Sequence, residues 1–178
     1  MSTLRAFIAV RIDRQRAGAS PLLSLLQRLN TFGRAVHAAA PDNLHMTLRF
    51  LGDIDIDRLP DVTRAIDAAA AAVSPFTVAL RGVGAFPDAQ QPRVIWAGMT
   101  DTTPLDALAA HLDSGLDGVG GIADRDKPFT AHLTLARVKA KPPRGCLTLM
   151  AEHAQADFGS FAIGGLHLIE STLTRAGP

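Results

Sequence analysis

The chain has 178 residues, 47% of them hydrophobic, and a formal net charge of +1 at pH 7. This length and apolar content favour a single folded domain and argue against a disordered chain, and the small net charge excludes a strong overall field for nucleic acid. Cys146 is the only cysteine, which excludes an intramolecular disulfide or a cysteine-based zinc site and favours a cytoplasmic protein. We expect no signal peptide and no membrane span, because no apolar run approaches the roughly 18 residues that a span needs.

Alternating or helically spaced apolar residues, with Gly and Pro at the breaks, predict the elements of the fold. In chain order, we expect a strand at residues 3–11, a helix from Ser20-Pro21 to Gly33, an extended piece at 35–39, a turn at 41–43, and a strand through His45 that stops near Gly52. Next come a helix at 57–73, strands at 76–80 and 93–97, a helix at 101–116, a strand at 129–138, a short helix at 145–154, and one or two strands at 158–174. This mixed order predicts an α+β fold.

Two short stretches, residues 44–48 (LHMTL) and 131–135 (AHLTL), carry the same His-x-Thr pattern inside apolar runs that favour strands. Because side chains alternate faces along a strand, the histidine and threonine of each stretch point the same way. The other four histidines lack this pattern. Two half-buried histidines, each bonded to a hydroxyl, are the alternative explanation. The repetition in the same setting favours a shared functional site.

Two such strands facing each other would present two imidazoles and two hydroxyls. Imidazole has an ordinary pKa of about 6.5, so one ring can act as a base while the other acts as an acid, and hydroxyls can donate to phosphoryl oxygens. No His-x-His pair or neighbouring carboxylate offers the usual metal ligands, so we expect no metal and no cofactor. The second motif lies within a basic stretch, residues 125–144, which is either a solvated loop or a means of steering phosphate.

The two motifs resemble those of the two-histidine phosphoesterases, and among these the bacterial RNA 2',3'-cyclic phosphodiesterases, also called 2'-5' RNA ligases. The segments that carry this resemblance are residues 7–10 (FIAV), 41–52 (PDNLHMTLRFLG), 84–87 (GAFP), 92–98 (PRVIWAG), 132–137 (HLTLAR), and Glu170-Ser171 with Leu173. They cover nearly the whole chain. The family often has Arg-Pro before the second motif, where this chain has Thr130-Ala131. Either a basic group is missing there or Lys127 replaces it.

The resemblance implies a bilobal α+β fold, in which two antiparallel sheets face each other across a central cleft with helices on the outside. It also implies a pseudo-two-fold duplication within a single two-lobed domain of residues 1–178. His45 and His132 would be the catalytic residues of this site. Thr47 and Thr134 would bind the substrate.

The resemblance further places a phosphate-binding arginine at Arg137. Strict alternation turns Arg137 away from His132, five residues earlier, so it reaches the phosphate only if the strand ends or bulges before it. Arg49 lies four residues after His45, so alternation places it on the same face and makes it a competitor for this role. Phe7 would border the cleft or else belong to the core.

The implied activity is metal-independent hydrolysis of RNA 2',3'-cyclic phosphate ends to 2'-phosphates, with weak ATP-independent 2'-5' ligation. The protein would be a monomer that acts on RNA and binds no membrane. We expect His132 to be the base for water and His45 the acid for the 3'-oxygen. Two alternatives are a phosphodiesterase for another small cyclic nucleotide or oligoadenylate, and a non-catalytic nucleotide- or RNA-binding module on the same scaffold.

Overall fold

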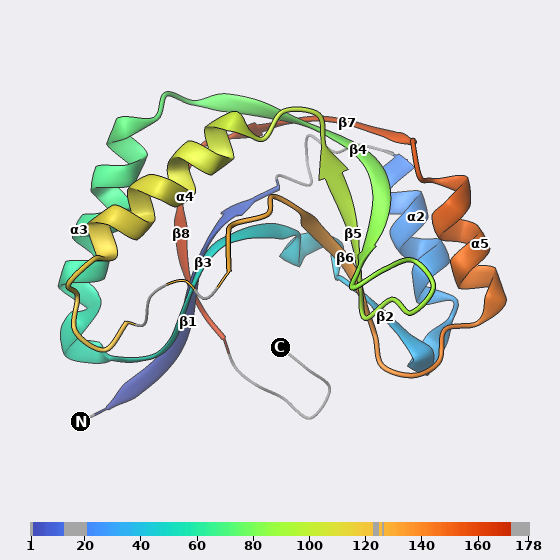
Figure 1. Ribbon diagram of the computed structural model, residues 1–178, viewed down its shortest axis with the longest axis horizontal. Helices are drawn as coiled ribbons and strands as arrows, with labels where there is room; N and C mark the ends of the chain where they lie inside the picture. The colour runs from blue at the N-terminus through green and yellow to red at the C-terminus, as the bar shows by residue number, and fades with distance from the viewer. Residues whose placement is uncertain (1, 13–20, 123–124, 126, 172–178) are drawn as a thin grey trace.

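The computed structural model describes residues 2–12, 21–122, 125 and 127–171 and has an α+β fold (Figure 1). The strands are β1 (Thr3–Arg11), β2 (Val36–Ala38), β3 (His45–Asp55), β4 (Phe76–Phe86), β5 (Val94–Met99), β6 (Leu133–Val138), β7 (Asp157–Ile163) and β8 (His167–Glu170). The α-helices are α2 (Pro21–Asn30), α3 (Leu59–Ala72), α4 (Thr103–Leu116) and α5 (Arg144–Glu152). Short 3-10 helices occur at η1 (Gly33–Ala35), η2 (Pro41–Asn43) and η3 (Ile56–Arg58).

The strands form two antiparallel sheets, one of them curled into a half-barrel. Their strand orders are β3-β1-β8 and β2-β6-β5-β4-β7. The two His-x-Thr motifs therefore belong to different sheets, the first at β3 and the second at β6. Because β3 contacts β6, the fold brings the two motifs together across the boundary between the sheets.

The α-helices lie outside the sheets in two pairs (Figure 1). Helices α3 and α4 pack on each other, and α4 packs on β3, whereas α2 contacts strands of the five-stranded sheet and α5 contacts β4. The helix expected after Ser20-Pro21 is confirmed as α2, and its four leucines recur at helical spacing and are fully or almost fully buried: Leu22, Leu25, Leu26 and Leu29. In the part of the chain that the structure describes, no helix is long and apolar enough to span a membrane.

Three predicted strand ends are wrong. The strand of the first motif continues past Gly52 to Asp55, because Gly52 adopts a φ of 74° within the strand and lies at a shift of its register. The strand expected to end at Leu80 continues to Phe86, and the strand of the second motif begins only at Leu133. His132 therefore lies directly before the first residue of β6 and not within the strand.

The C-terminal part follows the prediction more closely. The short helix expected at residues 145–154 is confirmed as α5. The segment expected as one or two strands forms two, and they separate, with β7 joining the five-stranded sheet and β8 joining the three-stranded sheet. Ser20, where the first helix was expected to open, and residues beyond 171 lie outside the described residues.

Candidate active site

The two motif imidazoles are held in the same way. Nδ1 of His45 lies 2.7 Å from the carbonyl oxygen of Asn43, and Nδ1 of His132 lies 2.7 Å from the carbonyl oxygen of Thr130. Because a carbonyl oxygen only accepts, each Nδ1 carries a proton and donates it, so in the neutral ring each Nε2 carries the lone pair. The same contact with the residue two positions earlier occurs in both motifs, so the site is duplicated in its geometry as well as in its sequence.

Thr47 and Thr134 follow the predicted alternation. Both are partly exposed, whereas the residues that flank them are buried: Met46, Leu48, Leu133 and Leu135. In the ladder of the second sheet, Thr134 lies opposite Trp96 of β5, which itself lies opposite Gly84 of β4. A Cβ atom at Gly84 would come within 2.3 Å of the indole, so glycine permits this packing. Each motif thus offers an imidazole and a hydroxyl from the less buried face of its strand.

Each imidazole also lies beside a phenylalanine ring. The ring centroids of Phe7 and His45 are 5.1 Å apart, and those of Phe86 and His132 are also 5.1 Å apart. Phe7 contacts Phe50 as well, with centroids 5.9 Å apart, and Phe50 is 69% exposed. The sequence left Phe7 either at the site or in the core, and the structure places it against His45. Phe86 was not predicted, although it lies in one of the segments that carry the family resemblance.

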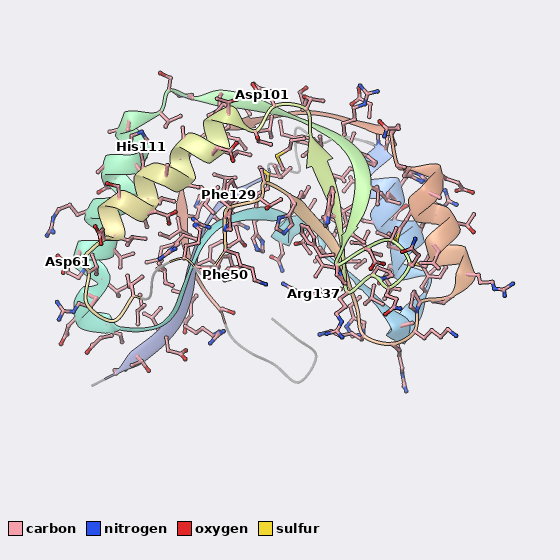
Figure 2. All side chains as sticks on the ribbon, viewed as in Figure 1. Phe50, Asp61, Asp101, His111, Phe129 and Arg137 are labelled. Atoms are coloured by element: carbon pink, nitrogen blue, oxygen red, sulfur yellow. The ribbon has the colours of Figure 1, made fainter. Side chains whose placement is uncertain are left out.

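A β-bulge in β6 brings Arg137 back to the face of Thr134. In the β5–β6 ladder, Thr134 and Ala136 lie opposite consecutive residues of β5, so Leu135 is an extra residue. Leu135 and Ala136 are both buried and Arg137 is exposed, because a bulge resets the alternation of side chains. Figure 2 shows Arg137 in the middle of the molecule, between the two helix pairs. The structure therefore meets the condition under which Arg137 can reach a phosphate.

The same kind of bulge in β3 turns Arg49 away from the site. Thr47 and Arg49 lie opposite consecutive residues of β1, so Leu48 is the extra residue. Arg49 is 5% exposed, and its Nη1 lies 3.2 Å from Oδ1 of Asp113 in α4. The alternation argument that placed Arg49 on the histidine face is therefore wrong, because it assumed an unbroken strand. Phe50 occupies the exposed position instead.

The surroundings of His45 favour its neutral form in the free protein. Its pKa is lowered, chiefly because burial removes water from the ring, and the positive charges of Arg11 and Arg137 lower it further. The hydrogen bond to the Asn43 carbonyl opposes these effects. Arg11 lies opposite His45 in the β1–β3 ladder and donates to the carbonyl oxygen of Asp42 at 3.1 Å. Two cations from different sheets therefore act on one imidazole, an arrangement suited to an anionic ligand.

Arg11 was not predicted as a site residue, although it lies four residues after Phe7 in the expected first strand, so alternation places the two on the same face. The basic stretch of residues 125–144 does not act as one unit. The charge of Arg137 acts on His45, whereas Arg125 is held by Asp113, with Nε 2.8 Å from Oδ2. Its other basic residues are exposed: Lys127, Lys139, Lys141 and Arg144.

Other kinds of reactive centre have little support. Among the described residues, no group of three or more His, Cys, Asp and Glu side chains is placed to hold a metal ion. Cys146 is fully buried, and burial raises the pKa of its thiol, which disfavours the reactive thiolate. The polar side chains that the described residues bring to the two motifs are imidazole, hydroxyl and guanidinium groups.

Comparison with known proteins identifies the family. The sequence matches the family model of the 2'-5' RNA ligase superfamily over residues 18–175. The chain belongs to this superfamily. It is 34% identical over 176 residues to a protein of Archaeoglobus fulgidus named RNA 2',3'-cyclic phosphodiesterase, with 98% of this chain and 95% of the relative covered. It is 30% identical over 179 residues to a protein of the same name from Aquifex aeolicus, with 100% of this chain and 94% of the relative covered.

Solved structures with the same fold are also found. A Thermus thermophilus protein aligns with a TM-score of 0.79 at 32% identity, covering 98% of this chain and 92% of the other. Escherichia coli LigT complexed with 3'-AMP aligns with a TM-score of 0.70 at 24% identity, covering 98% of this chain and 91% of the other. The second likeness shows the fold alone.

Proposed function

We propose that this member of the 2'-5' RNA ligase superfamily is an RNA 2',3'-cyclic phosphodiesterase that leaves a 2'-phosphate, built as a single two-lobed domain of residues 1–178. The observation that carries the proposal is the duplicated pair of groups, His45 with Thr47 and His132 with Thr134. In both pairs Nδ1 is fixed at 2.7 Å from a carbonyl oxygen, which leaves Nε2 available. The relatives from Archaeoglobus fulgidus and Aquifex aeolicus, which carry the name of this activity, support it over nearly the full chain.

The two imidazoles supply the acid and the base of an in-line displacement at phosphorus. Water attacks on one side of the phosphorus while the 3'-oxygen leaves on the other, so one ring is needed on each side. General acid–base help of this kind contributes roughly 10²–10⁴-fold to the rate. The hydroxyls of Thr47 and Thr134 donate hydrogen bonds to the non-bridging oxygens as negative charge develops there. No step of this scheme requires a metal ion.

The charged and aromatic residues around the imidazoles bind the rest of the substrate. Arg137 and Arg11 provide positive charge for the phosphate from two different sheets. Phe7 and the exposed ring of Phe50 provide an apolar surface for the nucleoside, because an aromatic ring can stack on a base. The same surface accepts any base, so this site sets the position of the terminal nucleotide more than its identity.

We assign His132 as the base for water and His45 as the acid for the 3'-oxygen. The acid role requires a protonated His45, whereas its pKa is lowered in the free protein. A bound phosphate anion offsets the charges of Arg11 and Arg137, so substrate binding raises that pKa and favours the protonated ring. A 3'-thio leaving group needs little protonation, so it should rescue His45→Ala and leave His132→Ala inactive. The opposite rescue pattern would reverse the assignment.

The defining experiment is turnover of 2',3'-cyclic AMP by the purified protein, with the products separated by chromatography. The expected product is 2'-AMP, and a 3'-AMP product would contradict the proposed leaving group. Binding without turnover would instead support a nucleotide- or RNA-binding module. Turnover restricted to another small cyclic nucleotide or an oligoadenylate would move the substrate to that class.

The same site should also join RNA ends weakly. An RNA 5'-hydroxyl differs from water only as the nucleophile, so a 2',3'-cyclic end and a 5'-hydroxyl end should give a 2'-5' linkage without ATP. An absolute requirement for ATP would contradict this. We also propose that the protein acts as a monomer in the cytoplasm, where its lone buried Cys146 needs no disulfide partner. Light scattering in solution would test the monomer directly.

A further inference from the structure

The side chain of Arg125 joins a helix to a strand. Arg125 lies between α4 and β6, and its side chain is 21% exposed. Its Nε lies 2.8 Å from Oδ2 of Asp113, and its Nη2 lies 3.0 Å from Oδ1 of the same carboxylate. Nη2 also donates to the carbonyl oxygen of Leu48 at 2.8 Å. A planar guanidinium suits this arrangement, because its donors form a rigid fork that can pair with both oxygens of a carboxylate while another N–H donates to a carbonyl.

The carbonyl that Arg125 binds belongs to the extra residue of the β3 bulge. The equivalent residue of the second motif is Leu135, whose carbonyl oxygen accepts a hydrogen bond from the backbone N–H of Ala39 at 2.8 Å. That partner comes from the segment beside β6, which is an inner strand, whereas β3 is the edge strand of its sheet. At the first motif the donor is instead the side chain of Arg125, which reaches the bulge from a distant part of the chain.

The contacts of Asp113 extend this arrangement to both sides of the bulge. Its carboxylate pairs with Arg125 and also with Arg49, the residue that follows Leu48 in β3. The guanidinium of Arg125 lies 5.6 Å from the ring centroid of Phe129, three residues before His132. The segment that leads to the second imidazole is therefore attached to the strand that carries the first.

We propose that Arg125, held by Asp113, is a positioning residue that fixes the bulge of β3 and thereby sets the placement of His45 and Thr47 relative to His132. This inference rests on the proposed function. The physical reason is that side chains alternate faces along a strand, so a register slip of one residue turns them to the opposite face. Without the contacts of Arg125 with Asp113 and Leu48, the bulge after Thr47 can move or disappear. Arg125 itself needs no contact with the substrate.

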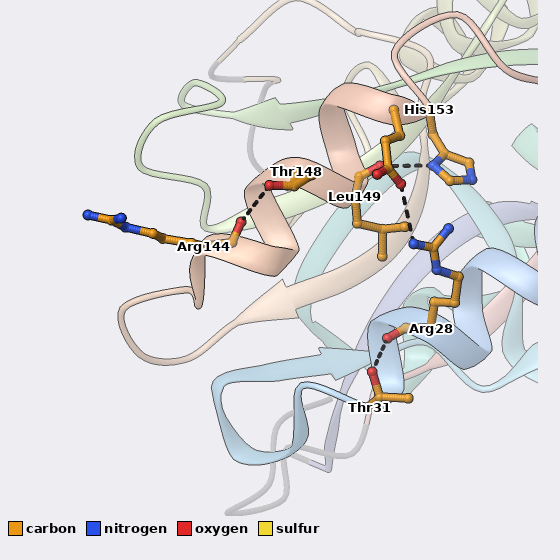
Figure 3. A network of polar contacts seen from close by, with 7 residues as sticks. Arg28, Thr31, Arg144, Thr148, Leu149 and His153 are labelled. Carbon is orange, nitrogen blue, oxygen red and sulfur yellow. Dashed lines mark hydrogen bonds and ion pairs between the residues drawn. The ribbon is translucent and has the colours of Figure 1, made fainter.

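The test compares Arg125→Ala and Arg125→Lys with a matched control, Arg28→Ala. Arg28 makes an ion pair with Glu152 at 3.3 Å, which joins α2 to α5 (Figure 3). The measurements are kcat and KM for 2',3'-cyclic AMP, the melting temperature, and amide hydrogen exchange of peptides that cover β3. All kinetics are measured well below the lowest melting temperature, so that every variant remains folded.

We expect Arg125→Ala to lower kcat by about 10²-fold, the loss typical of a small misplacement of reacting groups, with KM changed less than about threefold. Exchange should accelerate in the β3 peptides and not across the whole chain. Arg125→Lys keeps the charge but lacks the fork, so it should recover only part of kcat. Arg28→Ala should keep the wild-type kcat and the wild-type exchange of β3.

Two results would overturn the inference. One is a wild-type kcat in Arg125→Ala with unchanged exchange in β3. The other is a loss of kcat that only follows a lower fraction of folded protein, with exchange raised everywhere. If Arg125→Ala does not fold, the same criteria apply to Arg125→Lys. A wild-type protein without turnover would refute the proposed function, and exchange in β3 would still decide whether Arg125 holds the bulge.

Discussion

Arg137→Ala tests whether the bulge in β6 places Arg137 where it can bind the phosphate of the substrate. Arg137 is exposed on the face of Thr134, and its charge acts on His45 from the other sheet. A hydrogen bond to a charged group contributes about 1.5–3 kcal/mol. Loss of such a contact should therefore lower kcat/KM for a 2',3'-cyclic nucleotide by about 10- to 150-fold at 25 °C, as measured by initial rates.

The pH dependence of the same variant gives a second, independent measurement. Arg137 is one of the cations that lower the pKa of His45, so its removal should raise that pKa. The limb of the kcat/KM profile that His45 controls should then move to higher pH, because this profile reports groups of the free enzyme. An NMR titration of the His45 ring measures the change directly.

Lys139→Ala is the matched control for Arg137→Ala. Lys139 has the same charge, is exposed, and lies two residues further along the same basic stretch. It should leave kcat/KM and the pKa of His45 nearly unchanged. An equal effect of both variants would reduce Arg137 to one part of a diffuse positive field. A kcat/KM within twofold of wild type in Arg137→Ala would refute the reasoning from the bulge.

Other parts of the site respond to simpler perturbations. His45→Ala and His132→Ala should each lower turnover by at least about 10²-fold while circular dichroism stays unchanged, and near-full activity of either would contradict the two-imidazole mechanism. Excess EDTA should leave the activity unchanged, whereas a loss restored by a divalent ion would contradict the metal-free scheme. Gly84→Ala would place a Cβ 2.3 Å from the indole of Trp96, so it should lower the free energy of unfolding by about 1–3 kcal/mol in urea denaturation. The pKa of His45 is lower in the folded protein than the value of about 6.5 in the unfolded chain, so the unfolded chain binds more protons as the pH falls from that value. The free energy of unfolding should therefore decrease with falling pH, and it should decrease less steeply in His45→Ala. Equal pH dependence of stability in the two proteins would contradict the burial of this ring.

The features that the sequence predicted correctly depend on a few neighbouring residues. The leucines of α2 recur at helical spacing, and the fold buries all four of them. The alternation from His45 to Thr47 holds because no irregularity interrupts the strand between these two residues. Short-range periodicity was enough for these features, since each is decided within one or two turns of helix or a few residues of strand.

The positions after each threonine could not be predicted in this way. A bulge arises from how a strand pairs with its neighbour, and that neighbour lies far away in the sequence. Counting from His45 gave Arg49 the wrong face, and the same count gave Arg137 the right face only on the condition of a bulge. The contacts of Arg125 could not be predicted for a related reason, because only the tertiary fold brings Asp113 and Leu48 close to it.

Once both bulges are included, the two motifs correspond position by position. The buried Arg49 corresponds to the buried Ala136, and the exposed Phe50 corresponds to the exposed Arg137, five residues after each histidine. The duplicated strands therefore share an imidazole and a hydroxyl but differ in the side chain that follows on the same face. One strand offers an aromatic ring and the other a cation, which are the two chemistries that a nucleotide with a terminal phosphate requires. Because the residue five positions after the histidine differs between the two motifs, the site is suited to bind its substrate in one direction.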